Sequence, residues 1–106
     1  MNTVFLLGAE IDIQQAYEQF EEWSEGHGDR FLCELDGVLH VIASHPASAR
    51  LHLDDYRRAL ISHFPRGIFY VVEMDRIVIH AVLDLRQDPR TIMRRLRGFR
   101  SSTMPP

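Results

Sequence analysis

The chain has 106 residues, of which 45% are hydrophobic and 25% charged, and its formal net charge is −3. This composition excludes an intrinsically disordered chain and predicts a single domain over residues 1–100, followed by a flexible tail at 101–106. All twelve basic residues are arginines, so lysine-based catalysis is excluded and bidentate contacts with carboxylates or phosphates are favoured.

Two further features exclude a membrane span and an internal disulfide. The longest apolar run, Ile77 to Leu83, is far shorter than the roughly 18 residues that a span requires, so we expect a cytoplasmic protein. The single cysteine, Cys33, falls within an apolar helical pattern and is expected to be a buried thiol.

The first part of the chain predicts a strand followed by a helix. Thr3 to Leu7 is a short apolar run typical of a strand, and Gly8 ends it. From Ala9 to Glu25, apolar residues recur three or four positions apart, which predicts an amphipathic helix with an acidic outer face. The apolar positions of this helix are Ile13, Ala16, Tyr17, Phe20 and Trp23.

A second helix is predicted from Asp29 to Ser44, after a break at Gly26–Gly28 and before Pro46. Its residues expected to be buried are Phe31, Leu32, Leu35, Val38, Leu39 and Ile42. Because the link between the two helices is short, they should form an antiparallel hairpin.

The apolar pattern changes from helical to alternating after a polar connection at 45–55. Three strands are predicted: Tyr56 to Phe64, Ile68 to Glu73 and Ile77 to Asp84. The predicted turns between them are Pro65 to Gly67 and Met74 to Arg76. The turns are short, so the three strands should form an antiparallel meander.

A short basic helix is predicted from Arg90 to Arg97, with Pro89 in its first turn and Asp88 as its N-cap. The whole order predicts an α+β fold with an N-terminal strand, an antiparallel helical hairpin, a three-stranded antiparallel meander and a short C-terminal helix. We expect the hairpin to bury one face of the sheet and to leave the other, partly apolar face open for a partner.

Six short segments carry a family resemblance. They are Asp29–Leu32, His45–Pro46, Tyr56–Pro65, Ile68–Glu73, Asp75–Val82 and Arg86–Arg90. In this order they resemble the RelE/ParE superfamily of bacterial toxins, specifically its ParE, or plasmid-stabilisation, branch. The sequence departs from the family at Asp84–Leu85, where members often have His-Gly, and in its lack of lysine.

The resemblance implies a RelE/ParE-like toxin of a type II toxin–antitoxin system. Such a protein would inhibit growth by binding DNA gyrase and would be neutralised by a ParD-like antitoxin. ParE-type members are understood to act without catalysis, so the resemblance implies neither an enzyme nor a cofactor. Two alternatives stay open: a ribosome-dependent mRNA endonuclease of the RelE type, and a non-toxic relative that only binds its partner.

An endonuclease would need groups that activate the 2′-hydroxyl, stabilise the charged phosphorane and protonate the leaving oxygen. The RelE-type set of lysines with a C-terminal tyrosine is missing here. A glutamate and histidine version would use His63, Glu73 or His80. We expect His80 to share a strand face with Val78 and Val82, which favours a structural role for it. The six histidines and the single cysteine show no metal-ligand spacing, so no metal site is expected.

Eight arginines are the candidate partner-binding residues, because guanidinium groups anchor acidic partners through bidentate contacts. They are Arg57, Arg58, Arg66, Arg76, Arg86, Arg90, Arg94 and Arg95. We expect them to converge around the open sheet face and to bind the acidic C-terminal segment of an antitoxin. Direct nucleic-acid binding is disfavoured by the acidic first helix and the negative net charge.

Overall fold

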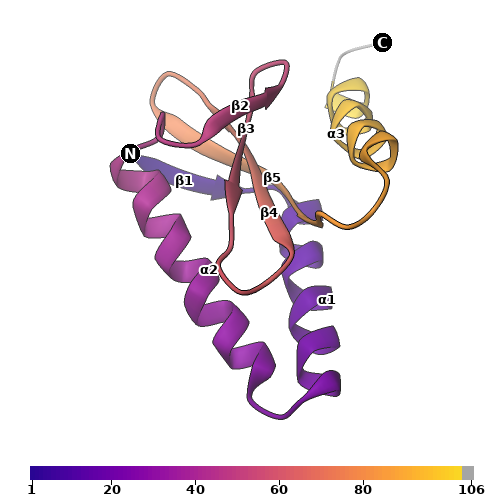
Figure 1. Cartoon of the computed structure of the whole chain (residues 1–106). Helices are drawn as coiled ribbons and strands as arrows, with labels where there is room; N and C mark the ends of the chain where they lie inside the picture. The colour runs from indigo at the N-terminus through magenta and orange to yellow at the C-terminus, as the bar shows by residue number, and fades with distance from the viewer. Residues whose placement is uncertain (104–106) are drawn as a thin grey trace.

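The computed structural model describes the backbone of residues 1–103 and the side chains of residues 1–98, so the end of the expected tail, 104–106, lies outside the described part. The elements are β1 (Asn2–Phe5), α1 (Leu7–Trp23), α2 (His27–Ser44), β2 (Arg50–Leu53), β3 (Tyr56–Leu60), β4 (Arg66–Val72), β5 (Arg76–Asp84) and α3 (Pro89–Thr103). Figure 1 shows the sheet between the hairpin of α1 and α2 on one side and α3 on the other. The predicted α+β fold is confirmed.

The described strands form one five-stranded sheet in the order β1-β5-β4-β3-β2. The meander is confirmed, because β3, β4 and β5 pair antiparallel in sequence. At one edge β1 pairs in parallel with β5, and at the other edge β2 pairs with β3. The strand β2 was not predicted, since the region 45–55 was expected to be a polar connection. It has only four residues and is largely exposed, so it lacks a buried face to mark it in the sequence.

The tip of the helical hairpin depends on two glycines. Gly26 has a φ angle of +85°, which residues with side chains rarely adopt. A Cβ atom on Gly28 would lie 2.8 Å from the backbone oxygen of Tyr17, so a larger residue would push the two helices apart. The carboxylate of Glu21 accepts hydrogen bonds from the amides of Gly26 and Gly28 at 3.0–3.1 Å. These bonds satisfy free amides at the start of α2, which begins at His27, earlier than predicted.

The first hydrophobic cluster lies between the hairpin and the sheet. Its buried members are Ala9, Ala16, Phe20, Phe31, Leu35, Ile42, Ala59, Ile61, Phe64, Ile68, Tyr70, Ile77, Ile79 and Val82. Three residues predicted to be buried, Trp23, Leu32 and Cys33, are instead exposed. Trp23 is the last residue of α1, at the hairpin tip beyond the sheet (Figure 1). Leu32 and Cys33 follow the buried Phe31 around α2 by about 100° each, so they turn away from the sheet.

The second hydrophobic cluster lies between the opposite face of the sheet and α3. Its buried members are Tyr56, Phe69, Val71, Ala81, Leu83, Ile92 and Leu96. The expectation of an open second face was therefore wrong, because Ile92 and Leu96, one helical turn apart, give α3 an apolar stripe that packs on this face. The Tyr56 hydroxyl donates to the Leu96 carbonyl oxygen at 3.0 Å and ties the helix to the sheet. The predicted N-cap is confirmed, because the Arg90 amide donates to Asp88 Oδ1 at 2.8 Å.

A β-bulge at His80 changes which side chains share a face. The pairing of Phe69 with Ala81 is followed by that of Tyr70 with Ile79, so His80 is an extra residue in β5. Its ring lies on the α3 side, with Nδ1 3.3 Å from the Tyr56 hydroxyl. Val82 instead joins the hairpin-side cluster. The prediction that His80 and Val82 share a face was therefore wrong.

The turn between β3 and β4 comes earlier in the sequence than predicted. β3 ends at Leu60, and Arg66, which was expected in the turn, is the first residue of β4. The amide of Ile61 donates to the Arg66 carbonyl oxygen at 3.1 Å, and His63 adopts a φ angle of 66°. A positive φ angle strains a residue that has a side chain. The side chain of His63 is held by a contact with Glu34, in which His63 Nδ1 lies 2.9 Å from Glu34 Oε1.

Substitution of Leu96 tests whether α3 is an integral part of the fold. The side chain is fully buried, so Leu96→Ala should lower the free energy of unfolding by about 2–5 kcal/mol through lost burial and a residual cavity. Met93 lies on the same helix and is 37% exposed, so Met93→Ala should have a much smaller effect. Urea unfolding followed by circular dichroism measures both. Equal effects would mean that α3 does not close the second face.

Candidate functional site

The structure does not gather the eight predicted arginines around one sheet face. Arg57 points toward the hairpin side of β3, where its Nη1 donates to the carbonyl oxygens of Ala49 at 2.7 Å and Ala47 at 3.3 Å. It holds the connection after α2 in place. Arg94 is exposed on α3. A partner-binding role for each of the eight arginines stays a prediction. The expectation that they converge around one sheet face was wrong.

Three of the eight pair with acidic residues close by in sequence. These ion pairs are Arg76–Glu73 at 2.7 Å, Arg86–Asp84 at 2.9 Å and Arg90–Asp88 at 3.1 Å. The Arg76–Glu73 and Arg90–Asp88 pairs are exposed and contribute little to stability, whereas Asp84 is half-buried beneath an exposed Arg86. The three pairs nevertheless neutralise much of the positive charge that the sequence places around the sheet.

Arg95 connects α3 to α1. Its Nη2 donates to both carboxylate oxygens of Asp12, at 3.0 and 2.9 Å, and to the carbonyl oxygen of Gly8 at 3.3 Å. Asp12 Oδ2 also accepts the amide of Val82 at 3.0 Å, so this carboxylate joins α1, β5 and α3. Burial raises the pKa of Asp12, while the Val82 amide and the charge of Arg95 oppose the rise. Arg95 thus acts inside the fold.

Arg66 is the one buried charged residue among the described side chains, at 5% exposed. Its Nη1 lies 3.1 Å from Asp84 Oδ2, its Nη2 donates to Gln19 Oε1 at 2.8 Å, and its guanidinium sits 5.0 Å from the Phe20 ring centroid. Burial lowers the pKa of Arg66, and Asp84 counteracts this. Hydrogen bonds from Arg86, together with the charges of Arg86 and Arg66, lower the pKa of Asp84 from its ordinary 3.8 to about 2.

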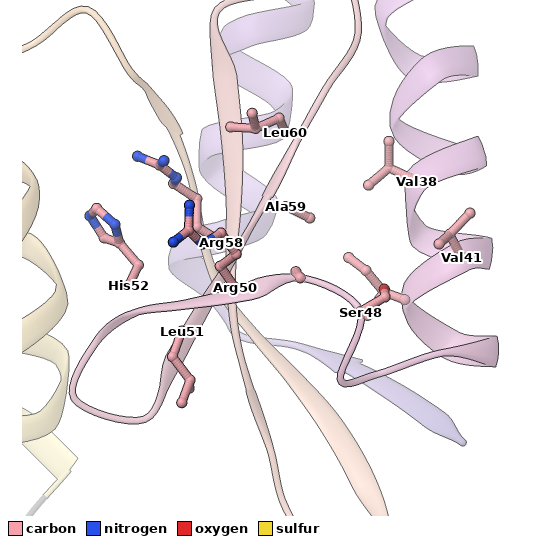
Figure 2. A pocket seen from close by; sticks show the side chains of 11 residues that line it. Val38, Val41, Ser48, Arg50, Leu51, His52, Arg58, Ala59 and Leu60 are labelled. Carbon is pink, nitrogen blue, oxygen red and sulfur yellow. The ribbon is translucent and has the colours of Figure 1, made fainter.

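The clearest surface recess is a groove between α2 and the strands β2 and β3, with a volume of about 610 Å³. We call it the α2–β3 groove. It is lined by Val38, Val41, Ile42, Ser48, Ala49, Arg50, Leu51, His52, Arg58, Ala59 and Leu60. Figure 2 shows Val38 and Val41 on α2 facing Ala59 and Leu60 across the groove. Val41, Leu51 and Leu60 are 54–60% exposed, so apolar surface is left open here.

The edge of the sheet is incomplete beside this groove. The pairing of β2 with β3 ends at Arg58, so Ala59 and Leu60 continue β3 without β2 alongside. An extended segment from another chain could pair there and place alternate side chains on the apolar groove wall.

Two guanidinium groups lie side by side at the same edge. Arg50 and Arg58 are directly paired positions of β2 and β3, and Figure 2 shows both with His52 on the α3 side of the strands. Neither has an ion-pair partner among the described residues. Like charges on directly paired positions destabilise a sheet, so an acidic group from outside the chain would relieve the repulsion. The pKa of His52 is lowered by burial and by the charge of Arg58.

Arg50 and His52 were not among the predicted site residues. They belong to β2, and without that strand no sequence pattern places them beside Arg58. The only signal was the short alternation Arg-Leu-His-Leu at 50–53, which is typical of a strand but weak at four residues.

The residues of the endonuclease alternative lie apart from one another. His63 follows β3 and contacts Glu34, whereas Glu73 follows the opposite end of β4 and pairs with Arg76. His80 lies under α3 beside Tyr56, in the middle of β5. In the described part of the chain, no three histidine, cysteine or acidic side chains are grouped so that they could hold a metal ion.

Comparison with known proteins identifies the class of fold. No family model matches the chain, and no curated protein matches it in sequence. Among solved structures, the chain matches one from the chromosomal ParDE TA system of P. aeruginosa with a TM-score of 0.71 and 11% identity, over 81% of this chain and 97% of that one. The chain therefore shares its fold with that chain of the ParDE TA system. No helix in the described residues has the length and apolar character to span a membrane.

The Asp84 carboxylate, which is bound by Arg86 and paired with Arg66, predicts a pH dependence of stability. Because the pKa of Asp84 is lowered to about 2 in the folded state, its contribution is complete above pH 4 and is lost as the pH falls toward 2. Asp84→Asn should lower the free energy of unfolding at pH 7 by about 1 kcal/mol, and the difference from the parent protein should shrink as the pH falls from 4 through 2. Urea unfolding across this range measures it.

Asp36→Asn is the control for this measurement, since Asp36 is 72% exposed and its ion-pair partner within residues 1–98 is the exposed His40. It should change stability little at any pH. A difference between Asp84→Asn and the parent protein that stays constant down to pH 2 would contradict the assigned role of the Asp84 charge.

Proposed function

We propose that the chain is the toxin component of a type II toxin–antitoxin system and acts by binding, as ParE-like toxins do, rather than by catalysis. The observation that carries the proposal is the Arg50–Arg58 pair beside the open apolar α2–β3 groove, in a chain with a ParE-like fold. The separation of His63, Glu73 and His80 supports binding over RNA cleavage. The two alternatives, an mRNA endonuclease and a non-toxic relative, each predict a different result in the expression experiment described below.

The partner that fits the α2–β3 groove is an acidic, amphipathic segment of a ParD-like antitoxin. Its apolar side chains would cover Val41, Leu51 and Leu60, which are more than half exposed. Its carboxylates would bind the guanidinium groups of Arg50 and Arg58 in the bidentate geometry that arginine favours. Pairing along the free edge of β3 would fix its register.

The target of the toxin in this proposal is DNA gyrase, on the strength of the family resemblance. Recognition of gyrase would be a protein–protein contact. The net charge of −3 and the pairing of most arginines with acids in the same chain leave little positive surface for the DNA backbone.

The proposal is tested by expressing the protein alone and together with the small ribbon-helix-helix-type protein of a neighbouring reading frame. Growth arrest with double-strand breaks and altered plasmid supercoiling, relieved by the partner, is the expected result. Ribosome-dependent cuts in mRNA that disappear in His63→Ala or His80→Ala would replace the proposal with the endonuclease. Normal growth with a tight complex would indicate the non-toxic relative.

Charge reversal at Arg58 should separate binding from stability. Arg58→Glu removes a cation from the α2–β3 groove, so partner affinity should fall at least tenfold, about 1.4 kcal/mol or more. Because the variant also removes the repulsion with Arg50, its melting temperature should not fall. Arg76→Glu is the matched control, since Arg76 is the first residue of β5, does not line the groove and should leave affinity unchanged. Isothermal titration calorimetry measures both variants, and equal losses of affinity would contradict the assigned docking site.

A further inference from the structure

A second pocket, of about 340 Å³, lies at the hairpin tip, where the end of α1 and the start of α2 meet the β3–β4 turn and the connection from β5 to α3. We call it the tip pocket. It is lined by Gln19, Phe20, Trp23, His27, His63, Phe64, Pro65, Arg66 and Arg86. It has no lining residue in common with the α2–β3 groove, so it is a separate surface.

One wall of the tip pocket is aromatic. Trp23 is 76% exposed and meets the His27 ring edge to face, with centroids 5.3 Å apart. His27 in turn packs against the buried Phe64 at 5.6 Å. The rings thus form a supported stack whose outermost member, the indole, is open to solvent. An exposed tryptophan on such a support is the kind of residue that anchors protein partners.

The other wall is cationic and contains a buried group without a complete set of hydrogen bonds. The Arg66 side chain is 6% exposed, and its Nη1 makes no hydrogen bond, although Asp84 lies 3.1 Å away as an ion-pair partner. Arg66 Nη1 is closed to solvent, so an acceptor from outside would reach this wall at the exposed guanidinium of Arg86, with the buried charge of Arg66 behind it. Arg86 lines the same wall, and its side chain is 69% exposed.

The charge balance decides which acceptor fits. Arg66 and Arg86 share one carboxylate, Asp84, so this wall carries one net positive charge. The carboxylates of Glu21 and Glu34 lie close by, bonded to the amide of Gly28 and to His63. A single carboxylate matches this balance, whereas phosphate groups, with more charge, would be repelled by the surrounding acids.

We propose that the tip pocket is a docking site for a protein segment that presents an aromatic side chain beside one carboxylate. The aromatic ring packs on Trp23 and His27, and the carboxylate accepts hydrogen bonds from the exposed guanidinium of Arg86, beside the buried charge of Arg66. The pocket volume accommodates one such pair of side chains. This inference is independent of the proposed function, because it concerns a different surface and needs no toxic activity.

Trp23 is the only tryptophan in the chain, so intrinsic fluorescence reports on the tip pocket directly. The probe is the capped dipeptide N-acetyl-phenylalanyl-glutamate amide, which has no indole of its own. It should change the fluorescence saturably, with a dissociation constant of about 0.1–1 mM. The matched glutamine dipeptide, which lacks the charge, should bind about tenfold more weakly.

Two exposed arginines with the same local pairing provide the control. Arg86 and Arg90 each bond an aspartate two residues earlier, through both the backbone amide and the guanidinium, but Arg90 lies outside the tip pocket. Arg86→Ala should weaken binding of the glutamate dipeptide about fivefold to tenfold, and Arg90→Ala should leave it unchanged.

Several results would overturn the inference. They are the absence of any saturable change, equal binding of the two dipeptides, and equal losses in the two arginine variants. Inorganic phosphate that produces the fluorescence change at lower concentration than the glutamate dipeptide would also overturn it, because the site would then select phosphate. Circular dichroism of each variant checks that the fold is retained.

Discussion

The structure depends on the burial of the two central strands from both sides. β4 is buried from Arg66 to Val71, and β5 is buried over most of its length, with side chains alternating between the two hydrophobic clusters. Strands of this kind have nearly continuous apolar sequences and need cover on both faces. The hairpin supplies one cover and α3 the other. Since both faces are used within the chain, the surface left for a partner lies at the edge of the sheet, where β2 is short and β3 extends beyond it.

The distribution of arginines follows from the same constraint. A guanidinium at the start of a doubly buried strand needs partners inside the fold, and Arg66 finds Asp84, Gln19 and the Phe20 ring. Most other arginines pair with acids of the same chain. Arg50 and Arg58 are different, because they are directly paired on the outer strands and have no acid of their own among the described residues. The cations available for recognition are thus those at the sheet edge and the exposed Arg94 on α3, together with Arg86 in the tip pocket.

The sequence predicted the elements whose apolar period is long or strong: the two hairpin helices and the three meander strands. It could not predict β2, whose four residues gain their structure from pairing with β3, or the bulge at His80, which depends on the register between β4 and β5. The stripe of Ile92 and Leu96 was visible in the sequence and would have predicted that α3 covers the second face. Of the candidate site, Arg58 was identified, whereas Arg50 and His52 required the strand that was missed. The exposure of Trp23 could not be predicted either, because it depends on where α1 ends relative to the sheet.

Amide hydrogen exchange of the complex with the proposed ribbon-helix-helix-type partner tests the central claim most directly, because it maps the occupied surface without any substitution. Exchange should slow at the end of α2, along β2 and at Leu60, whose amide faces the open edge, when the partner is bound, while the amides of α3 keep their rates. Protection concentrated on α3 and the sheet face beneath it, with the edge unchanged, would contradict the account.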